Sequence, residues 1–252
     1  MCLGSEARKG ETAVRIGDMD NNTTRVLLFD IDGTLMDSAN EVTICLSRAM
    51  EDVYGTAGPI ESYDMHGKTD WQIVTELMDM AGFEAVVVEA GLSKVFGAYA
   101  RHVELAAPTL KMRTLPGVTD LLRALVSEPN FILGLVTGNA RAAVPNKLRA
   151  VGLDPGLFTF GAFGDDHRDR NRLPPLALYR LEQILGARVP SESALVIGDT
   201  PRDIECARSA GLKVLCVATG SYPRDALARC APDYLLDDMV DTDTVLLILK
   251  EF

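Results

Sequence analysis

The sequence has no hydrophobic run of the ~18 residues that a membrane-spanning helix needs. Basic residues are also scarce: 25 Lys and Arg stand against 36 Asp and Glu, which gives a formal net charge of -11. This balance argues against nucleic acid or an anionic membrane as the main partner. An anionic substrate would therefore need positive charge concentrated at one place.

Paired cysteines are missing as well. The five cysteines are scattered without a Cys-x-x-Cys pair, and most lie in apolar periodic segments. This distribution favours buried free thiols in a reducing compartment over a disulfide framework. The first residues lack the apolar core of a signal peptide, so we expect a cytoplasmic protein with a weakly ordered polar tail at residues 1–24.

The chain does contain enough apolar residues, 47% of 252, for a substantial core. Strand and helix patterns alternate from about residue 115, and the apolar run 26–29 supplies an earlier strand, which predicts an α/β fold with a doubly wound parallel sheet. Residues 40–112 show only successive helical patterns and predict a small all-helical cap domain inserted after the first strand. The core domain would then comprise residues 25–39 and 113–252.

Two carboxylates follow the first predicted strand. Alternate residues of an extended chain project to the same side, so Asp30 and Asp32 can face one small volume before Gly33 turns the chain. The carboxyl ends of parallel strands are where open α/β sheets bind ligands. Two like charges there favour a bound cation, and Mg²⁺ suits a few carboxylates completed by water and phosphate. Such acids often only cap a turn, but the apolar strand before them favours a site.

Polar residues also end two later strands. Thr137, Gly138 and Asn139 could form a phosphate cradle, although threonine and asparagine are favoured helix caps as well. Asp199 could complete a metal site opposite Asp30. Asp203 could bind the metal through water or orient Asp199, and an acid in the first turn of a helix is also favoured by the helix dipole.

Three segments, in this order and separation, resemble the haloacid dehalogenase superfamily of phosphohydrolases, in its phosphoglycolate phosphatase-like subgroup: LLFDIDGTL, LVTGN and VIGDTPRDIECARSAG. The match covers nearly the whole chain after residue 24. The resemblance implies that Asp30 attacks phosphorus and becomes an aspartyl-phosphate. It implies that Asp32 protonates the leaving oxygen, later takes a proton from the hydrolytic water, and offers its backbone carbonyl to Mg²⁺.

The resemblance also calls for one basic residue, where the family commonly has Lys-Pro-x-Pro. This sequence has Arg-Leu-Pro-Pro, beginning at Arg172. Counting back from Gly186 aligns Arg172 with the family's lysine, but Arg170 in the same loop could serve instead. Either arginine keeps its charge and offers a planar fork to phosphate.

Lys68 lies in a loop of the helical insertion from which family members commonly contact substrate. It is therefore a candidate for binding the leaving group, and closure of the insertion would exclude water. The segment 36–40, which precedes the insertion, is expected to act as a hinge.

We therefore expect a Mg²⁺-dependent phosphatase that hydrolyses a small phosphorylated metabolite through an aspartyl-phosphate. A phosphomutase would use the same residues and is poorly separated by sequence. A 2-haloacid dehalogenase would attack carbon with the same carboxylate but would need neither metal nor a second acid, so Asp32, Asp199 and Asp203 argue against it. A non-catalytic binding protein is least expected, because nearly every chemical position is filled.

Overall fold

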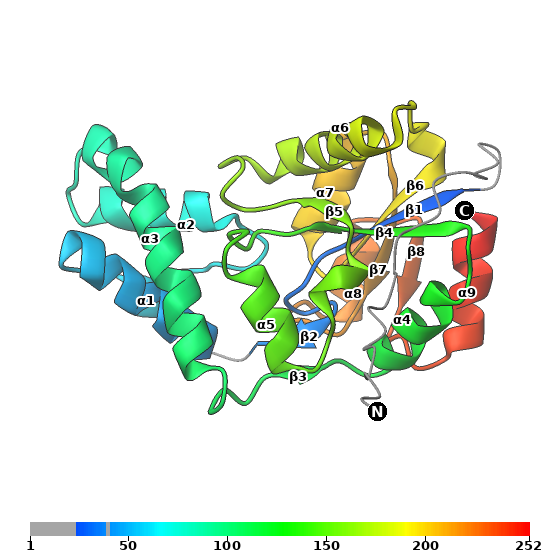
Figure 1. Ribbon diagram of the computed structural model, residues 1–252, viewed down its shortest axis with the longest axis horizontal. Helices are drawn as coiled ribbons and strands as arrows, with labels where there is room; N and C mark the ends of the chain where they lie inside the picture. Colours follow the sequence, from blue (N-terminus) through cyan, green and yellow to red (C-terminus); the bar gives the residue numbers. More distant parts are fainter. Residues whose placement is uncertain (1–23, 39–40) are drawn as a thin grey trace, which may run out of the picture.

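The computed structural model describes residues 24–38 and 41–252 (Figure 1). Residues 1–23 of the expected tail, and the last two residues of the expected hinge at 36–40, lie outside the described residues.

A six-stranded sheet forms the centre of the molecule, and all of its neighbouring strands run parallel. The strands lie in the order β5 (Phe160–Ala162), β4 (Phe131–Val136), β1 (Arg25–Phe29), β6 (Ala194–Gly198), β7 (Lys213–Val217) and β8 (Tyr234–Leu236). The order of the strands in the sheet differs from their order in the sequence, as is typical of a doubly wound sheet. The predicted fold class is confirmed.

Strand β1 is apolar throughout because both of its faces are covered. Leu27 and Phe29 belong to one hydrophobic cluster, and Val26 and Leu28 belong to the other. The alternation of side chains along a strand therefore divides one continuous apolar run between two cores.

Helices supply the other half of each core. One face of the sheet packs against α4 (Val118–Val126), α5 (Val144–Ala150) and α9 (Thr242–Glu251). The opposite face packs against α6 (Leu173–Leu185), α7 (Pro201–Ser209) and α8 (Arg224–Arg229). Short 3₁₀ turns join the remaining elements: η2 (Ile60–Ser62), η3 (Pro155–Leu157), η4 (Arg170–Arg172) and η5 (Ser191–Ser193).

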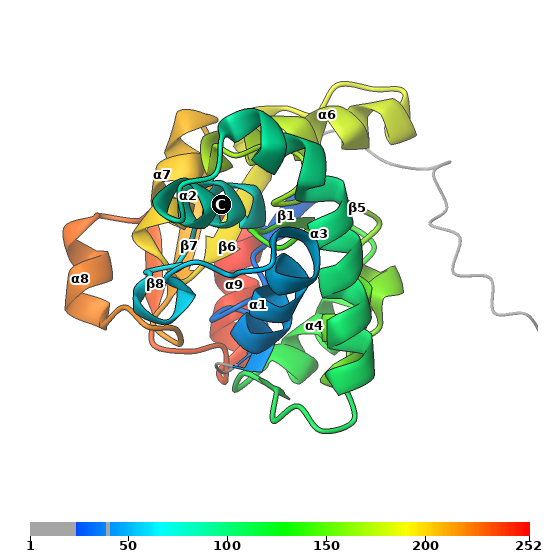
Figure 2. The same cartoon turned by 90° about the vertical axis from the view of Figure 1, so that its left-hand side faces the viewer.

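The predicted helical insertion follows the first strand. It contains α1 (Glu41–Tyr54), α2 (Asp70–Met80) and α3 (Ala85–Ala106), and Figures 1 and 2 show these helices grouped beside one end of the sheet. The short antiparallel pair β2 (Met36–Asp37) and β3 (Arg113–Thr114) brings the two ends of the insertion together. The domain limits at residues 40 and 112 stay a prediction.

Pro145 lies in the first turn of α5, where its missing N–H removes no helical hydrogen bond. The helix therefore begins at Val144 instead of directly after β4, so the proline delays its start and does not kink it. In the part of the chain that the structure describes, no helix combines the length and apolarity needed to cross a membrane.

Candidate active site

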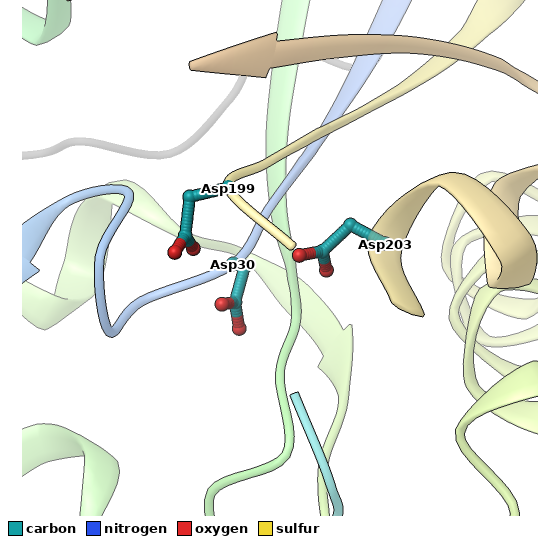
Figure 3. Close-up of side chains that lie close together, drawn as sticks. All are labelled: Asp30, Asp199 and Asp203. Atoms are coloured by element: carbon teal, nitrogen blue, oxygen red, sulfur yellow. The ribbon is translucent and has the colours of Figure 1, made fainter. Parts of the chain in front are cut away.

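Three buried carboxylates meet at the carboxyl ends of the two central strands (Figure 3). Asp30 follows β1, Asp199 follows β6, and Asp203 lies in the first turn of α7. Phe29 pairs with Ile197 in the parallel register, which brings the two strand ends level with each other. One oxygen from each carboxylate lies within 4.8 Å of the others.

The burial and closeness of these carboxylates raise the pKa of two of them. Burial raises the pKa of Asp30 to about 6, with Arg170 opposing the shift and Asp203 adding to it. Burial, with Asp203 and Asp30 nearby, likewise raises the pKa of Asp199 well above its usual range. Positive charge at this place would therefore stabilise the ionised cluster.

The surroundings of Asp199 fit a site for a hard divalent cation. A Cβ atom on Gly33 would lie 2.3 Å from the carboxylate of Asp199, and one on Gly220 would lie 1.7 Å from it, so only glycine allows both loops this close. Thr34 donates a hydrogen bond to Oδ1 of Asp199 at 3.1 Å and helps to orient it. The donors offered by the cluster are all carboxylate oxygens, which Mg²⁺ prefers.

Asp203 is held by its own helix. Its Oδ2 accepts hydrogen bonds from the backbone N–H of Thr200 at 3.0 Å and from the Thr200 hydroxyl at 2.7 Å, which completes a capping box. Its Oδ1 accepts a hydrogen bond from Arg170. The helix-start role expected from the sequence is therefore present, and it leaves a contact to metal through water open as a second role.

Arg170 is the cation that the fold brings to the carboxylates. Its side chain is only 6% exposed, and its Nη2 lies 3.1 Å from Oδ1 of Asp30 while it also pairs with Asp203. Its Nη1 donates to the carbonyl of Gly67, in the helical insertion, at 3.2 Å. Arg172, two residues later, is exposed at the start of α6. Of the two arginines that the sequence left open, the structure therefore places only Arg170 beside Asp30.

The predicted phosphate cradle follows β4 and contacts the second acid of the first motif. Thr137 and Asn139 are both buried, and Nδ2 of Asn139 donates to Oδ2 of Asp32 at 2.6 Å and to Oγ1 of Thr137 at 2.8 Å. Gly138 approaches the insertion so closely that a Cβ there would lie 2.1 Å from the carbonyl oxygen of Lys68. The cradle is thus shared between Asp32 and the inserted helices.

Lys147 in α5 is a site residue that the sequence did not predict. Its ammonium lies 2.7 and 2.6 Å from the two carboxylate oxygens of Asp32 and 2.5 Å from Oδ1 of Asn139, and its side chain is 1% exposed. Burial would raise the pKa of Asp32, but Lys147, with hydrogen bonds from Ser38 and Asn139, holds it below the usual value. The available signal was a lysine on the buried face of a helix, next to Leu148.

Lys68 points its ammonium into the helical insertion. It lies 2.8 Å from Glu76 and 2.6 Å from the hydroxyl of Tyr63, and 4.1 Å above the centre of the Tyr63 ring. Burial would raise the pKa of Glu76, but hydrogen bonds from Lys68 and its neighbours lower it to about 2. The ammonium thus already has an anionic partner, and its expected contact with the leaving group stays a prediction.

Several known proteins resemble this chain. A relative from Synechococcus elongatus, named phosphoglycolate phosphatase, is 30% identical over 86% of this chain and 94% of its own length. A relative of the same name from Vibrio cholerae is 27% identical over 85% of this chain and 93% of its own length.

Solved structures share the fold at lower identity. A hydrolase from Pseudomonas syringae aligns with a TM-score of 0.64 at 23% identity, over 89% of this chain and 99% of that one. CbbY from Rhodobacter sphaeroides, in complex with xylulose-(1,5)bisphosphate, aligns with a TM-score of 0.66 at 19% identity, over 86% and 96% of the two chains. The model of the haloacid dehalogenase-like hydrolases matches residues 27–217, and together with these similarities it shows that the chain belongs to that family.

Proposed function

We propose that this protein is a Mg²⁺-dependent phosphatase that hydrolyses a small phosphorylated metabolite through an aspartyl-phosphate on Asp30. The observation that carries the proposal is the placement of Asp30. Its carboxylate lies at the end of β1, beside a buried arginine and two further acids, and β1 pairs with β4, the strand that leads to Thr137. A nucleophile for phosphorus needs this combination of a free carboxylate and positive charge near the phosphoryl oxygens.

The first half of the reaction forms a bond between Asp30 and phosphorus while the bond to the leaving oxygen breaks. Arg170 balances the charge of Asp30, and the Thr137 hydroxyl binds a phosphoryl oxygen. Asp32 must carry a proton at this step, although Lys147 favours its ionised form in the free protein, and it gives this proton to the leaving oxygen. Bound Mg²⁺, for which Asp30, Asp199 and the Asp32 carbonyl are the proposed ligands, would neutralise charge on the phosphoryl group.

The second half of the reaction regenerates the enzyme. Asp32, now ionised, takes a proton from the water that attacks phosphorus, and the bond between Asp30 and phosphorus breaks. Lys147 and Asn139 stabilise the ionised form of Asp32. Inorganic phosphate then leaves with the carboxylate of Asp30 restored.

The curated relatives point to a first substrate. Those from Synechococcus elongatus and Vibrio cholerae carry the name phosphoglycolate phosphatase. We therefore propose 2-phosphoglycolate, a small and strongly anionic monoester, as the substrate to test before others. Arg170 gives the carboxylate cluster a local positive charge that the chain as a whole, at -11, does not supply.

The deciding experiment measures inorganic phosphate released from 2-phosphoglycolate and from 4-nitrophenyl phosphate, with Mg²⁺ or with EDTA. We expect Asp30→Asn to reduce kcat at least about 1,000-fold, because the amide cannot form the acyl-phosphate. The exposed Asp243→Asn, in the first turn of α9, is the matched control and should keep wild-type activity.

Comparable activity in Asp30→Asn would overturn the proposed nucleophile. Full activity in EDTA would remove the metal from the mechanism. Isomerisation of a hexose phosphate, which has further hydroxyl groups to accept the phosphoryl group, without release of phosphate would instead identify a phosphomutase.

A further inference from the structure

Lys147 is a fully buried cation whose contacts all lie on the proposed catalytic machinery. We infer that Lys147 is a positioning residue that fixes the carboxylate of Asp32 for proton transfer and, through Asn139, the donor direction of Thr137. The inference rests on the proposed phosphatase function and adds a residue to its site. It starts from three short contacts of one ammonium group.

The hydrogen-bonding rules leave one arrangement for Asn139. An ammonium group has three donors and no acceptor, so the atom of Asn139 that faces Lys147 at 2.5 Å must be the carbonyl oxygen. The amide nitrogen then faces the other way, where it donates to Asp32 at 2.6 Å and to Thr137 at 2.8 Å. Lys147 therefore selects which way round the side chain of Asn139 lies.

The orientation of Asn139 in turn sets the role of Thr137. The hydroxyl oxygen of Thr137 accepts from the side-chain amide of Asn139 and from its backbone N–H at 3.3 Å. With its oxygen occupied as an acceptor, the hydroxyl hydrogen is the group left to donate. A donor in the cradle is what a phosphoryl oxygen requires, whereas the reversed amide would compete for the same hydrogen.

The burial of the pair also suits a positioning role. The ammonium side chain of Lys147 is 1% exposed, whereas the side chain of Asp32 is 39% exposed, so the lysine lies behind the carboxylate and leaves it reachable. Ser38 donates a further hydrogen bond to Oδ1 of Asp32. Burying an ammonium group is unfavourable in free energy. An apolar side chain at this position of α5, beside Leu148, would pack without that penalty.

A leaving-group comparison tests the inference. The alkoxide of 2-phosphoglycolate needs a proton as it leaves, and 4-nitrophenolate does not, so only the first substrate depends strongly on a well-placed Asp32. We expect Lys147→Met to lower kcat/KM about 100-fold for 2-phosphoglycolate but less than about 10-fold for 4-nitrophenyl phosphate. The ratio kcat/KM is used because it reports the steps up to transfer of phosphorus to Asp30. The control Lys94→Met, exposed on α3, should change neither value.

A second comparison decides the matter even if Lys147→Met alone does not fold. The double variant Asp32→Asn/Lys147→Met removes both charges and leaves no unpaired ion in the interior. In the Asp32→Asn background only the part of the effect that passes through Thr137 remains, so adding Lys147→Met should lower kcat/KM for 2-phosphoglycolate less than about tenfold, as it does for 4-nitrophenyl phosphate.

Two results would overturn the inference while leaving the phosphatase proposal intact. One is an equal fold-loss on both substrates in Lys147→Met, which a merely structural lysine would produce. The other is a further loss of about 100-fold when Lys147→Met is added to Asp32→Asn. A wild-type protein that hydrolyses neither substrate would instead contradict the proposed function itself.

Discussion

At the scale of single residues, two basic side chains pair with different acids of the site. Arg170 lies against Asp30 and Asp203, while Lys147 lies against Asp32. The planar guanidinium suits the first place because its fork reaches two carboxylates and the carbonyl of Gly67 together. Each acid of the first motif therefore has a cation of its own.

The two arginines of the η4 turn should differ sharply on substitution. We expect Arg170→Met to lower kcat/KM at least about 100-fold, because it leaves Asp30 and Asp203 as buried like charges without a partner. Arg170→Lys keeps one charge and should lose less. Arg172→Met removes an exposed charge and should stay within about twofold of wild type. A larger loss in Arg172→Met than in Arg170→Met would reverse the assignment.

At the scale of elements, the start of α2 is hydrogen-bonded to two loops of the core. The backbone N–H of Asp70 donates to the carbonyl of Gly138 at 2.7 Å, and that of Trp71 donates to the carbonyl of Gly164 at 3.2 Å. The carboxylate of Asp70 accepts from the N–H of Ala140 at 2.7 Å. These contacts connect the helical insertion to the predicted phosphate cradle without any side chain of the catalytic cluster.

Glycine is required where these backbones meet. A Cβ atom on Gly164 would lie 1.6 Å from the carbonyl oxygen of Gly138, and backbone cannot move aside as a flexible side chain can. We expect Gly164→Ala to lower the melting temperature and to reduce kcat/KM at least about tenfold by displacing the cradle. Gly97→Ala, in α3 where a Cβ meets only Arg101 at 3.8 Å, is the matched control. It should keep activity and add about 0.5–1 kcal/mol of stability.

Asp70 should make this contact sensitive to pH. Burial raises the pKa of Asp70 from 3.8 to about 7, against the opposing effect of the Ala140 N–H and Lys147. The folded protein then binds a proton at Asp70 that the unfolded chain has released between pH ~4 and ~7, so the contribution of this group to stability falls as pH rises through that window.

The Asp70→Asn variant removes this titration. Its stability relative to wild type should therefore increase from pH 4.5 to pH 8, by about 3 kcal/mol at about 1.4 kcal/mol per pKa unit. Urea unfolding of both proteins at these two pH values measures the difference. A stability difference that is the same at both pH values would show that Asp70 does not titrate in this range.

At the scale of the whole molecule, the polar residues that follow the strands lie together at the carboxyl end of the sheet. The rest of the interior of the described chain is apolar. Four cysteines in residues 24–38 and 41–252 are free, and three of these are buried. The three carboxylates of the cluster carry more negative charge than Arg170 alone balances, so a further bound cation would stabilise the fold.

Metal should accordingly stabilise the entire fold. A ligand that binds only the native state adds about 2.7 kcal/mol at a concentration of 100 times its Kd, so Mg²⁺ should raise the melting temperature over that in EDTA. Asp199→Asn should lose most of this increase, because it removes a proposed ligand that Gly33 and Gly220 hold in place. Thermal unfolding at constant ionic strength measures the effect. An equal increase in the variant would place the cation elsewhere.

The sequence by itself determined the parallel sheet and the end of its central strand, but not the edge strand β8. Residues 26–29 are apolar because strand β1 is covered on both faces, and Asp30 marks where that strand emerges. Parallel pairing of β1 and β6 then places Asp199 beside Asp30, because the carboxyl ends of parallel strands lie at the same end of the sheet. These features depend on residues that are close together in the sequence, so they can be predicted from it.

Only the tertiary structure decided which cations serve the site. Arg170 and Arg172 lie in one turn and have the same chemistry, and the packing of η4 against α7 decides that Arg170 is the buried one. Lys147 reaches Asp32 across 115 residues of sequence. The physical reason is that an ion pair depends on the distance between two side chains in space, which is set by how the elements pack and not by the spacing of either residue along the chain.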